Sequence, residues 1–378
     1  MGSTKLRDIA NIDRRVLLRA LLAAPLALSA RAAFAADAKN EDWKADWDRT
    51  LDSARKEGQL IVSGPVGRLW SDFLVPRFNK EFPGITLKMT PFAARDFWVR
   101  VIKEREVGQY LWDLRLGGTD SALFTLMRQG AITPTRPLLV LPENTDDDNW
   151  WGGIDGLFAD SAKTTLLAFG FQTSQTSFYN KDVIPQDLSA EDLIKPEWTG
   201  KISLDDPRGG SVFNQLAVLL KVYGEDYVRT LLLKQKVVIP GSKRQQVEWM
   251  VSGRYPIGFG VVAEDIIEVG QRGARVDMIV PIKTPAQTFS QGFGGISLID
   301  KAPHPNAAKV FINWILTRDI QTDLDQAVKI NSRRKGVLPG APHNAIDTSR
   351  LDQYFGHQTE DFNPYHERVA AIVREMPR

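Results

Sequence analysis

The chain has 378 residues, of which 43% are hydrophobic and 25% are charged, as is typical of a globular protein with one large domain or two smaller ones. The formal charge of +2 comes from the first 35 residues, where six basic residues stand against two acidic ones, and the remainder is slightly acidic. This balance excludes a broad positive surface for nucleic acid or anionic lipid. The absence of cysteine excludes disulfides, thiolate metal sites and cysteine nucleophiles.

The N-terminal segment predicts an export signal. Paired arginines in "DRRVLLR" (Asp13–Arg19) precede an apolar run of 11 residues (Ala20–Ala30), and "AFA" (Ala33–Ala35) supplies the small residues of a cleavage site. We therefore expect a twin-arginine signal peptide over residues 1–35, cut after Ala35, and a periplasmic location. The apolar run is too short to span a bilayer. An amphipathic terminal helix is the alternative interpretation.

The first part of the mature chain predicts alternating strands and helices. Apolar runs bounded by glycine and proline predict the strands, and apolar residues at a spacing near 3.6 predict the helices. The predicted strands are Gln59–Pro65, Ile85–Thr90 and Trp112–Gly118. The predicted helices are Glu41–Gly58, the segment from Leu69 to Phe78, Asp96–Val107 and Ser121–Gln129. Such alternation is typical of a parallel sheet with helices on both faces.

A loop-rich stretch, Thr133–Asp160, and two extended segments within Thr164–Asn180 separate this part from a second αβ series. The acidic run Asp146–Asp148 is interpreted as a solvated loop. The predicted strands of the second series are Lys201–Asp206, Val237–Pro240, Tyr255–Val262 and Val276–Ile282. Its predicted helices are Ser211–Val222, Gln245–Ser252 and Glu264–Arg272, and the chain later resumes helices, notably Asn306–Thr317.

Several motifs occur in a characteristic order around the start of the second series. They are "YNKD" (Tyr179–Asp182), "PEW" (Pro196–Trp198), "GKI" (Gly200–Ile202), "DP" (Asp206–Pro207), "YGEDY" (Tyr223–Tyr227), "SGRYPIGFG" (Ser252–Gly260) and "HPNAAKVFINWIL" (His304–Leu316). Because of these motifs the chain resembles the periplasmic solute-binding proteins of ABC importers that form family 1 of the extracellular solute-binding proteins. Within that family it resembles the group that includes ferric-iron-, thiamine- and phosphonate-binding members. The resemblance covers Gly58 to about Leu338.

The resemblance implies the type II two-lobe periplasmic binding protein fold, of class α/β. Each lobe is then a mixed, mainly parallel sheet flanked by helices, and two crossing segments join the lobes. The implied division is lobe one from residues 36–170 and 290–378 and lobe two from residues 171–289. The C-terminal tail after Gly336 carries no motif, and we expect it to pack on lobe one. The resemblance also implies a monomer without a cofactor that holds a small solute between lobes closing by a hinge motion, and that delivers it to the membrane subunits of an ABC permease.

Three glycine-containing loops follow predicted strands and precede predicted helices, where backbone N–H groups and the helix dipole favour an anionic ligand. The candidate ligand-binding residues in these loops are Ser63, Gly64, Arg68, Gly118, Thr119, Asp120, Arg208, Gly209, Gly210 and Ser211. Gln175 and Thr176 in the crossing region, and Glu264 after the strand Tyr255–Val262, add polar candidates. An arginine fork suits a carboxylate or phosphate. We therefore expect a small, anionic organic solute.

Each of these candidates has a structural alternative. The loops are alternatively ordinary strand-to-helix turns with capping residues. Arg68 and Arg208 are then solvated surface arginines, and Glu264 is an acid that complements a helix dipole. Three tryptophans that could stack on a ligand, Trp70, Trp98 and Trp112, are expected in the core because of their spacing.

Metal binding is the main alternative within the same fold. The iron-binding members of the resembled group use two adjacent tyrosines after a lobe-two strand, whereas the matching stretch here is "FGVVAED" (Phe259–Asp265). The four histidines, His304, His343, His357 and His366, show no metal-ligand spacing and are expected in structural or surface roles. We therefore expect no metal site, with a ferric-iron receptor as the alternative.

A secreted hydrolase is the alternative from another class. The sequence has no G-x-S-x-G elbow, no cysteine and no metal motif. Carboxylates such as Asp205, Asp206, Glu264 and Asp265 are the candidates for an acid/base pair in that case. The prediction is a binding protein and not an enzyme.

Overall fold

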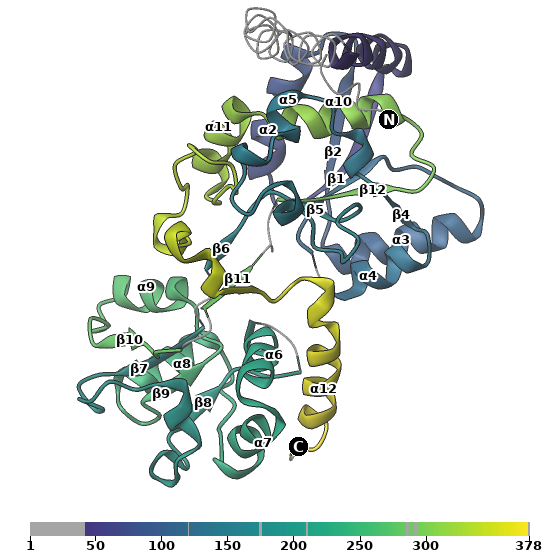
Figure 1. Ribbon diagram of the computed structural model, residues 1–378. Helices are drawn as coiled ribbons and strands as arrows, with labels where there is room; N and C mark the ends of the chain where they lie inside the picture. The colour runs from purple at the N-terminus through teal and green to yellow at the C-terminus, as the bar shows by residue number, and fades with distance from the viewer. Residues whose placement is uncertain are drawn as a thin grey trace, which may run out of the picture.

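The computed structural model describes residues 42–119, 121–173, 176–208, 211–284, 287–290 and 294–376. The predicted signal peptide and its cleavage site lie outside these residues. Figure 1 shows two lobes, one above the other, with the C-terminal helix α12 running down beside the lower one. None of the helices within the described ranges has the length and hydrophobicity needed to cross a membrane.

Lobe one is built on a mixed sheet of strand order β2-β1-β3-β12-β4, with β5 also paired to β12. Its strands are β1 (Gln59–Gly64), β2 (Thr86–Pro91), β3 (Leu114–Gly117), β4 (Ile132–Thr133), β5 (Leu167–Ala168) and β12 (Gly295–Ile299). A helix over residues 42–57, α2 (Leu69–Glu81), α10 (Pro305–Ile315) and α11 (Arg318–Val328) contribute to one apolar cluster. α3 (Ala94–Glu106) and α4 (Ser121–Arg128) contribute to a second cluster, so the sheet has two apolar layers.

Lobe two repeats this plan on a smaller sheet of order β10-β7-β9-β8. Its strands are β7 (Ser177–Asn180), β8 (Ile202–Leu204), β9 (Ile257–Phe259) and β10 (Ile279–Pro281). One apolar cluster joins α6 (Ser211–Tyr223) and α7 (Glu225–Arg229) to the strands, and another joins α8 (Lys243–Val251) and α9 (Ala263–Gln271). The segment Val237–Pro240, predicted as a strand, makes only one isolated bridge, between Val238 and Ser203.

The two-lobe α/β fold with mixed sheets is confirmed. Parallel pairing is less extensive than expected, because among the described strands of the two lobe sheets only β1 with β2 and β3, and β8 with β9, pair in parallel. The other pairs of the described strands in both lobe sheets are antiparallel. β12 enters the first sheet and β7 enters the second directly from the crossing region, and strands that arrive without a crossover helix run antiparallel to their neighbours.

Three chain segments meet between the lobes. β6 (Gln172–Thr173) and β11 (Gln287–Ser290) pair antiparallel, in line with the two predicted crossing segments. A third strand, β13 (Tyr354–Gly356), pairs parallel with β11 and was not predicted. The lobes are therefore connected by a small three-stranded sheet.

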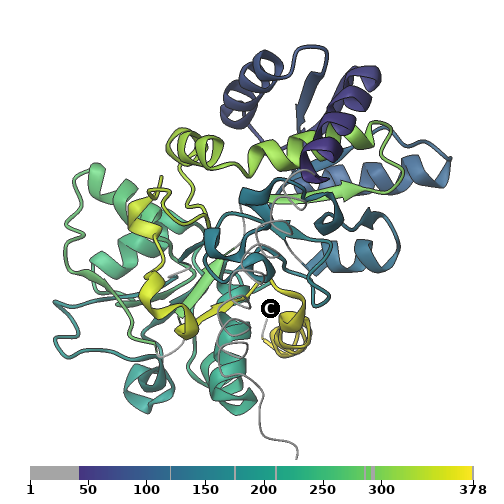
Figure 2. The ribbon, with the colours of Figure 1, turned by 45° about the horizontal axis from the view of Figure 1, so that its top comes forward.

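The C-terminal tail departs from its prediction. Helix α12 (Asn363–Val373) packs against α6, and both views show the two helices side by side (Figures 1 and 2). Phe362, Val369 and Ile372 belong to the apolar cluster of lobe two, and the Arg368 guanidinium donates to the Glu225 carboxylate at 2.5 Å. The expectation that the tail packs on lobe one is therefore wrong for α12, because its apolar side is buried against α6.

Candidate functional site

The ends of β1 and β3 in lobe one carry the first group of predicted residues. The Ser63 side chain is buried, and its Oγ accepts a hydrogen bond from Arg115 Nη1 at 2.7 Å. The same nitrogen donates to the Gly64 carbonyl at 2.8 Å. Thr119 is also buried, and its Oγ1 donates to the Gln358 carbonyl at 3.4 Å. The structure therefore brings these strand ends together at one edge of the sheet, where Arg115 holds the end of β1.

The end of β8 in lobe two carries the second group. Arg208 is exposed, and its Nε lies 2.7 Å from Asp206 Oδ1. The hydrogen bond from the Arg208 side chain lowers the pKa of Asp206. Asp205 accepts from Lys243 Nζ at 2.6 Å, and this ammonium group also donates to the Gly260 carbonyl after β9. The ends of β8 and β9 are therefore joined by Lys243.

Thr176 connects the crossing region to lobe two. It is buried, and its Oγ1 donates to Gln215 Oε1 of α6 at 2.6 Å. Gln215 Nε2 donates in turn to Ser177 Oγ at 2.7 Å. This chain of hydrogen bonds fixes the first turns of α6 relative to the crossing.

Two predicted residues have partners away from the strand ends. Arg68 is strongly exposed and pairs with Asp72 one turn along α2, at 3.4 Å. Glu264, in the first turn of α9, lies 3.0 Å from His343 Nε2 and accepts from Asn344 Nδ2 at 2.9 Å. Ala341, just before these two, is hydrogen-bonded to the Asn331 side chain that follows α11. Glu264 therefore links lobe two to a segment held on lobe one.

The remaining candidates are only partly described. Gly118 follows β3 and is half-buried, and Ser211 is the first residue of α6. Asp120, Gln175, Gly209 and Gly210 lie outside the described residues.

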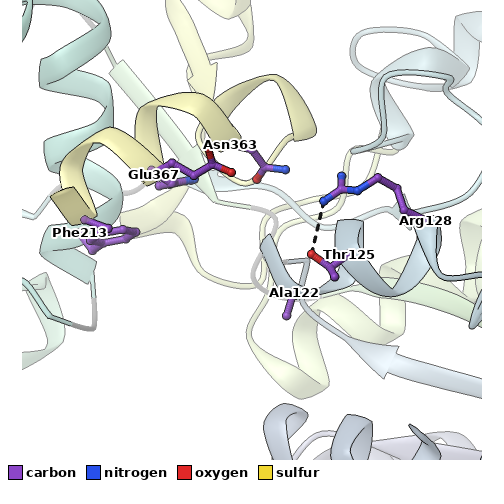
Figure 3. A pocket seen from close by; sticks show the side chains of 8 residues that line it. Ala122, Thr125, Arg128, Phe213, Asn363 and Glu367 are labelled. Atoms are coloured by element: carbon purple, nitrogen blue, oxygen red, sulfur yellow. Dashed lines mark hydrogen bonds between the residues drawn. The ribbon is translucent and has the colours of Figure 1, made fainter.

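A pocket of about 350 Å³ opens between the lobes, next to the starts of α4 and α6. Figure 3 shows side chains of α4 on one side and side chains of α6 and α12 on the other. The lining residues are Ala122, Thr125 and Arg128 of α4, Phe213 of α6, and Asn363, His366, Glu367 and Ala370 of α12. None of these residues was predicted. The available signal was weak: Thr125 and Arg128 are polar positions three apart on a mainly apolar helix.

One side of the pocket carries the cation of Arg128, and the other carries the Glu367 carboxylate and two stacked rings. Arg128 donates to Glu360 Oε1 at 3.2 Å and to Thr125 Oγ1 at 3.3 Å. Opposite, His366 Nε2 lies 3.1 Å from Asn214 Oδ1, and the imidazole stacks on the Phe213 ring with centroids 5.4 Å apart. Burial lowers the pKa of His366, so this side chain is neutral at physiological pH.

The other three histidines have partners or positions away from this pocket. His304 Nδ1 lies 2.9 Å from Asp113 Oδ2, and His343 contacts Glu264. Burial lowers the pKa of His357 to about 3. Among the described residues, no group of three or more His, Cys, Asp or Glu side chains is arranged to hold a metal ion.

The seven tyrosines, all within the described ranges, lie away from the strand end after β9, where Val261 and Val262 stand. Tyr179, Tyr223 and Tyr227 belong to or pack on the lobe-two apolar cluster, as does Tyr365. Tyr255 packs on Trp249, the Tyr110 hydroxyl accepts from Lys301, and the Tyr354 hydroxyl accepts from the Asp347 amide. This part of the site therefore offers no phenolate pair.

Comparison with known proteins gives consistent results. The family described as bacterial extracellular solute-binding protein matches residues 74–345. An uncharacterized protein of Haemophilus influenzae is 23% identical over 279 residues, which cover 71% of this chain and 76% of that protein.

Solved structures with the same fold include ferric iron-binding protein A of Mannheimia haemolytica in an open conformation, at 15% identity and a TM-score of 0.62. Iron-bound HitA of Pseudomonas aeruginosa is similar at 16% identity and a TM-score of 0.58. Each match covers 84% of this chain and 98% of the other. At such low identity the likeness shows the fold alone.

Proposed function

Because the chain belongs to the bacterial extracellular solute-binding protein family, we propose that it is the periplasmic substrate-binding component of an ABC importer. It captures a small, anionic organic solute between its lobes and delivers it to the membrane permease. In this role it acts as a monomer, by binding and not by catalysis. Export depends on the signal peptide proposed for residues 1–35. The lobe boundaries predicted from the sequence belong to the same proposal, with the exception of α12.

One observation carries this proposal: the pocket between the lobes has walls from both of them. A ligand that touches α4 and α12 together favours the arrangement in which both walls are close to it. The connecting sheet of β6, β11 and β13 is small enough to act as a hinge between two separately packed lobes. Binding and closure are therefore coupled, as delivery to a permease requires.

The charge of the solute is inferred from the surroundings of the strand ends. α4 and α6 both begin beside the pocket, and helix N-termini favour anions. Arg208 precedes α6, and its pair with Asp206 is exposed, so exchanging that carboxylate for a ligand carboxylate or phosphate costs little. These features support an organic anion.

Ferric iron is the second candidate, because named structural neighbours include ferric iron-binding proteins. Two valines after β9 and the positions of the tyrosines argue against phenolate ligation. Iron bound through an organic chelator such as citrate would still present carboxylates to the site and is therefore tested separately.

The test is a thermal-shift screen of residues 36–378 against organic phosphates, phosphonates, carboxylates, polyols, amines, ferric citrate and free ferric iron. A ligand at a thousand times its Kd stabilises the folded protein by about 4 kcal/mol, enough to raise Tm by several degrees. We expect a shift with one class of organic anion. A shift with free ferric iron alone would contradict the proposed solute, and turnover of the ligand would contradict the absence of catalysis.

Arg208→Ala tests the anion assignment. If Arg208 contacts the solute through a charge-assisted hydrogen bond, its removal weakens binding on the order of tenfold or more. Titration calorimetry measures the Kd, and Arg272→Ala is the matched control at an exposed arginine of lobe two that pairs with Glu268 of α9. Unchanged affinity in Arg208→Ala would remove this residue from the site.

A further inference from the structure

The pocket between the lobes presents hydrogen-bond donors on its lobe-one side. The bonds from Arg128 to Glu360 and Thr125 use two of the five N–H groups of its guanidinium. Thr125 Oγ1 accepts from Arg128, which leaves its hydroxyl hydrogen able to donate. Figure 3 shows the Arg128 side chain extending from α4 toward α12.

The α12 side of the pocket presents one exposed acceptor, the Glu367 carboxylate, and has two covered acceptor atoms beside it. Glu367 is exposed there and makes no hydrogen bond or ion pair with the described residues. Asn363 Oδ1 and His366 Nδ1 are covered atoms that also find no hydrogen-bond partner within the described ranges. A covered polar atom without a partner is costly. A half-turn of the half-buried Asn363 amide would bring Oδ1 toward the pocket, where a ligand could donate to it.

The rest of the side formed by α6 and α12 is aromatic and neutral. The rings of Phe213 and His366 stack there, and the bond between His366 and Asn214 fixes the imidazole. Since His366 is uncharged, Arg128 and Glu367 are the only charged side chains among the residues that line the pocket, and their charges oppose each other.

We propose that this pocket is a subsite for hydroxyl groups of the solute, contacted by Arg128 and Thr125 of α4 and by Asn363 and Glu367 of α12. A hydroxyl both donates and accepts, so it can use both sides of the pocket at once. A carboxylate or phosphate would use only the donors and would face Glu367, whereas an ammonium group would use only the acceptors and would face Arg128.

This inference rests on the proposed function, because the anionic end of the solute is placed at the start of α6 and only its hydroxylated part in the pocket. The solute is therefore a hydroxylated organic anion, and the C-terminal helix is part of its binding site. Residues from chain positions more than 230 apart form this subsite, which a search for local motifs does not detect.

The experiment compares matched ligands that differ only in hydroxyl groups. Titration calorimetry of residues 36–378 measures glycerol 3-phosphate against propyl phosphate, and tartrate against succinate. A site built to bind a hydroxyl rejects the analogue without it strongly, so we expect the hydroxylated member of at least one pair to bind at least about tenfold more tightly. Asn363→Ala and Glu367→Ala should each bring the two Kd values of that pair much closer together.

Two control variants separate the subsite from the anion site. Arg208→Ala should weaken both members of a pair by a similar factor, and Glu197→Ala, at an exposed glutamate of lobe two outside the pocket, should change neither. Two outcomes contradict the hydroxyl subsite but not the proposed function. One is equal binding of the two members in both pairs, and the other is a preference for the hydroxylated member that persists in Asn363→Ala and Glu367→Ala. No binding by any of the four compounds or by any organic anion in the screen contradicts the proposed function and the subsite together.

Discussion

The two lobes bury different kinds of polar group. In lobe one and the segment after α11 that packs on it, six ionisable side chains are buried: Asp113, Arg115, Asp160, Asp325, Arg333 and Arg334. In the described part of lobe two before the tail, the buried polar side chains are all neutral: Thr176, Ser177, Asn180, Ser203, Gln235 and Gln246. Lobe one therefore carries a desolvation cost that lobe two avoids.

The buried charges of lobe one lie where they serve the site and the crossing. Arg115 donates to the Ser63 hydroxyl and the Gly64 carbonyl at the end of β1. The Arg333 guanidinium lies over the Phe171 and Phe289 rings, at 4.9 Å and 4.8 Å from their centroids, beside the connecting strands. Lobe one thus uses charged groups to hold the strand end and the crossing. Its stability should depend on those groups and on pH more strongly than the stability of lobe two.

The largest expected effect follows from removing Arg334, whose two terminal nitrogens donate to four acceptors. Arg334 Nη2 lies 2.5 Å from Glu143 Oε2, and Nη1 donates to the Leu316 carbonyl at 2.6 Å. Arg334→Ala removes the donor of the Leu316 carbonyl, the Glu143 carbonyl and the buried Asn144 Oδ1, so we expect the free energy of unfolding to fall by about 3–5 kcal/mol. Urea unfolding followed by tryptophan fluorescence measures this loss, since most of the ten tryptophans lie in lobe one.

The matched change in lobe two is Gln246→Ala. Gln246 Nε2 donates to the Phe259 carbonyl at 2.9 Å and to the Ser203 carbonyl at 3.2 Å, so the variant removes one donor from each of these carbonyls and leaves no buried charge. The expected loss is about 1–3 kcal/mol. An equal or larger loss in Gln246→Ala than in Arg334→Ala would break the contrast between the lobes.

Local patterns were sufficient to predict most elements of the fold. The helix predicted from Ser211 to Val222 is α6 (Ser211–Tyr223), and the one predicted from Glu264 to Arg272 is α9 (Ala263–Gln271), because each has a continuous apolar stripe. The pairing partner of a segment is not a local property. The apolar side of α12 would suit either lobe, and only the folded chain brings it onto α6.

The sequence predicted where the candidate residues lie relative to the strands, but not where their side chains point. Ser63 and Thr119 do lie at strand ends, yet their hydroxyls are bonded to Arg115 and to the Gln358 carbonyl, contacts that depend on distant parts of the chain. The pocket between α4 and α12 was missed for the same reason. Its two sides become neighbours through tertiary contacts, among them those that Glu360 makes with Arg128 and the Ser161 amide before α12 begins.

The next effect is a pH dependence that sharpens the contrast. Burial raises the pKa of Asp325 from 3.8 to about 8, and among the described residues its Oδ2 accepts only from the Ser332 amide. Between about pH 4 and pH 8 the folded state holds a proton on this carboxyl that the unfolded state has lost. The free energy of unfolding therefore falls as pH rises through this window, by at most about 1.4 kcal/mol per pH unit from this group.

Asp325→Asn keeps the shape of the side chain and removes the titration. We expect urea midpoints of the variant to change less between pH 5 and pH 7.5 than those of the wild type. Asp192→Asn, at a carboxylate of lobe two whose pKa is lowered by a hydrogen bond from Lys195, is the control and should leave the slope across this window intact. A slope that is the same in Asp325→Asn and the wild type would show that Asp325 is ionised in the folded protein.

The smallest expected change concerns Arg333, a buried cation that has no carboxylate partner among the described residues. Its Nη1 donates to the Trp151 carbonyl at 3.3 Å, its Nε is covered without a partner there, and burial lowers its pKa to about 10. Replacing a buried charge by an apolar side chain of similar volume is often neutral or stabilising. Arg333→Met should therefore unfold within about 1 kcal/mol of the wild type or above it, whereas Arg333→Lys, which keeps the charge but loses the planar stacking on Phe171 and Phe289, should be less stable. Urea unfolding of both variants decides the point. A fall of about 3 kcal/mol in the free energy of unfolding of Arg333→Met would mean that the ring contacts of Arg333 outweigh the cost of its desolvation. The charges buried in lobe one would then stabilise that lobe.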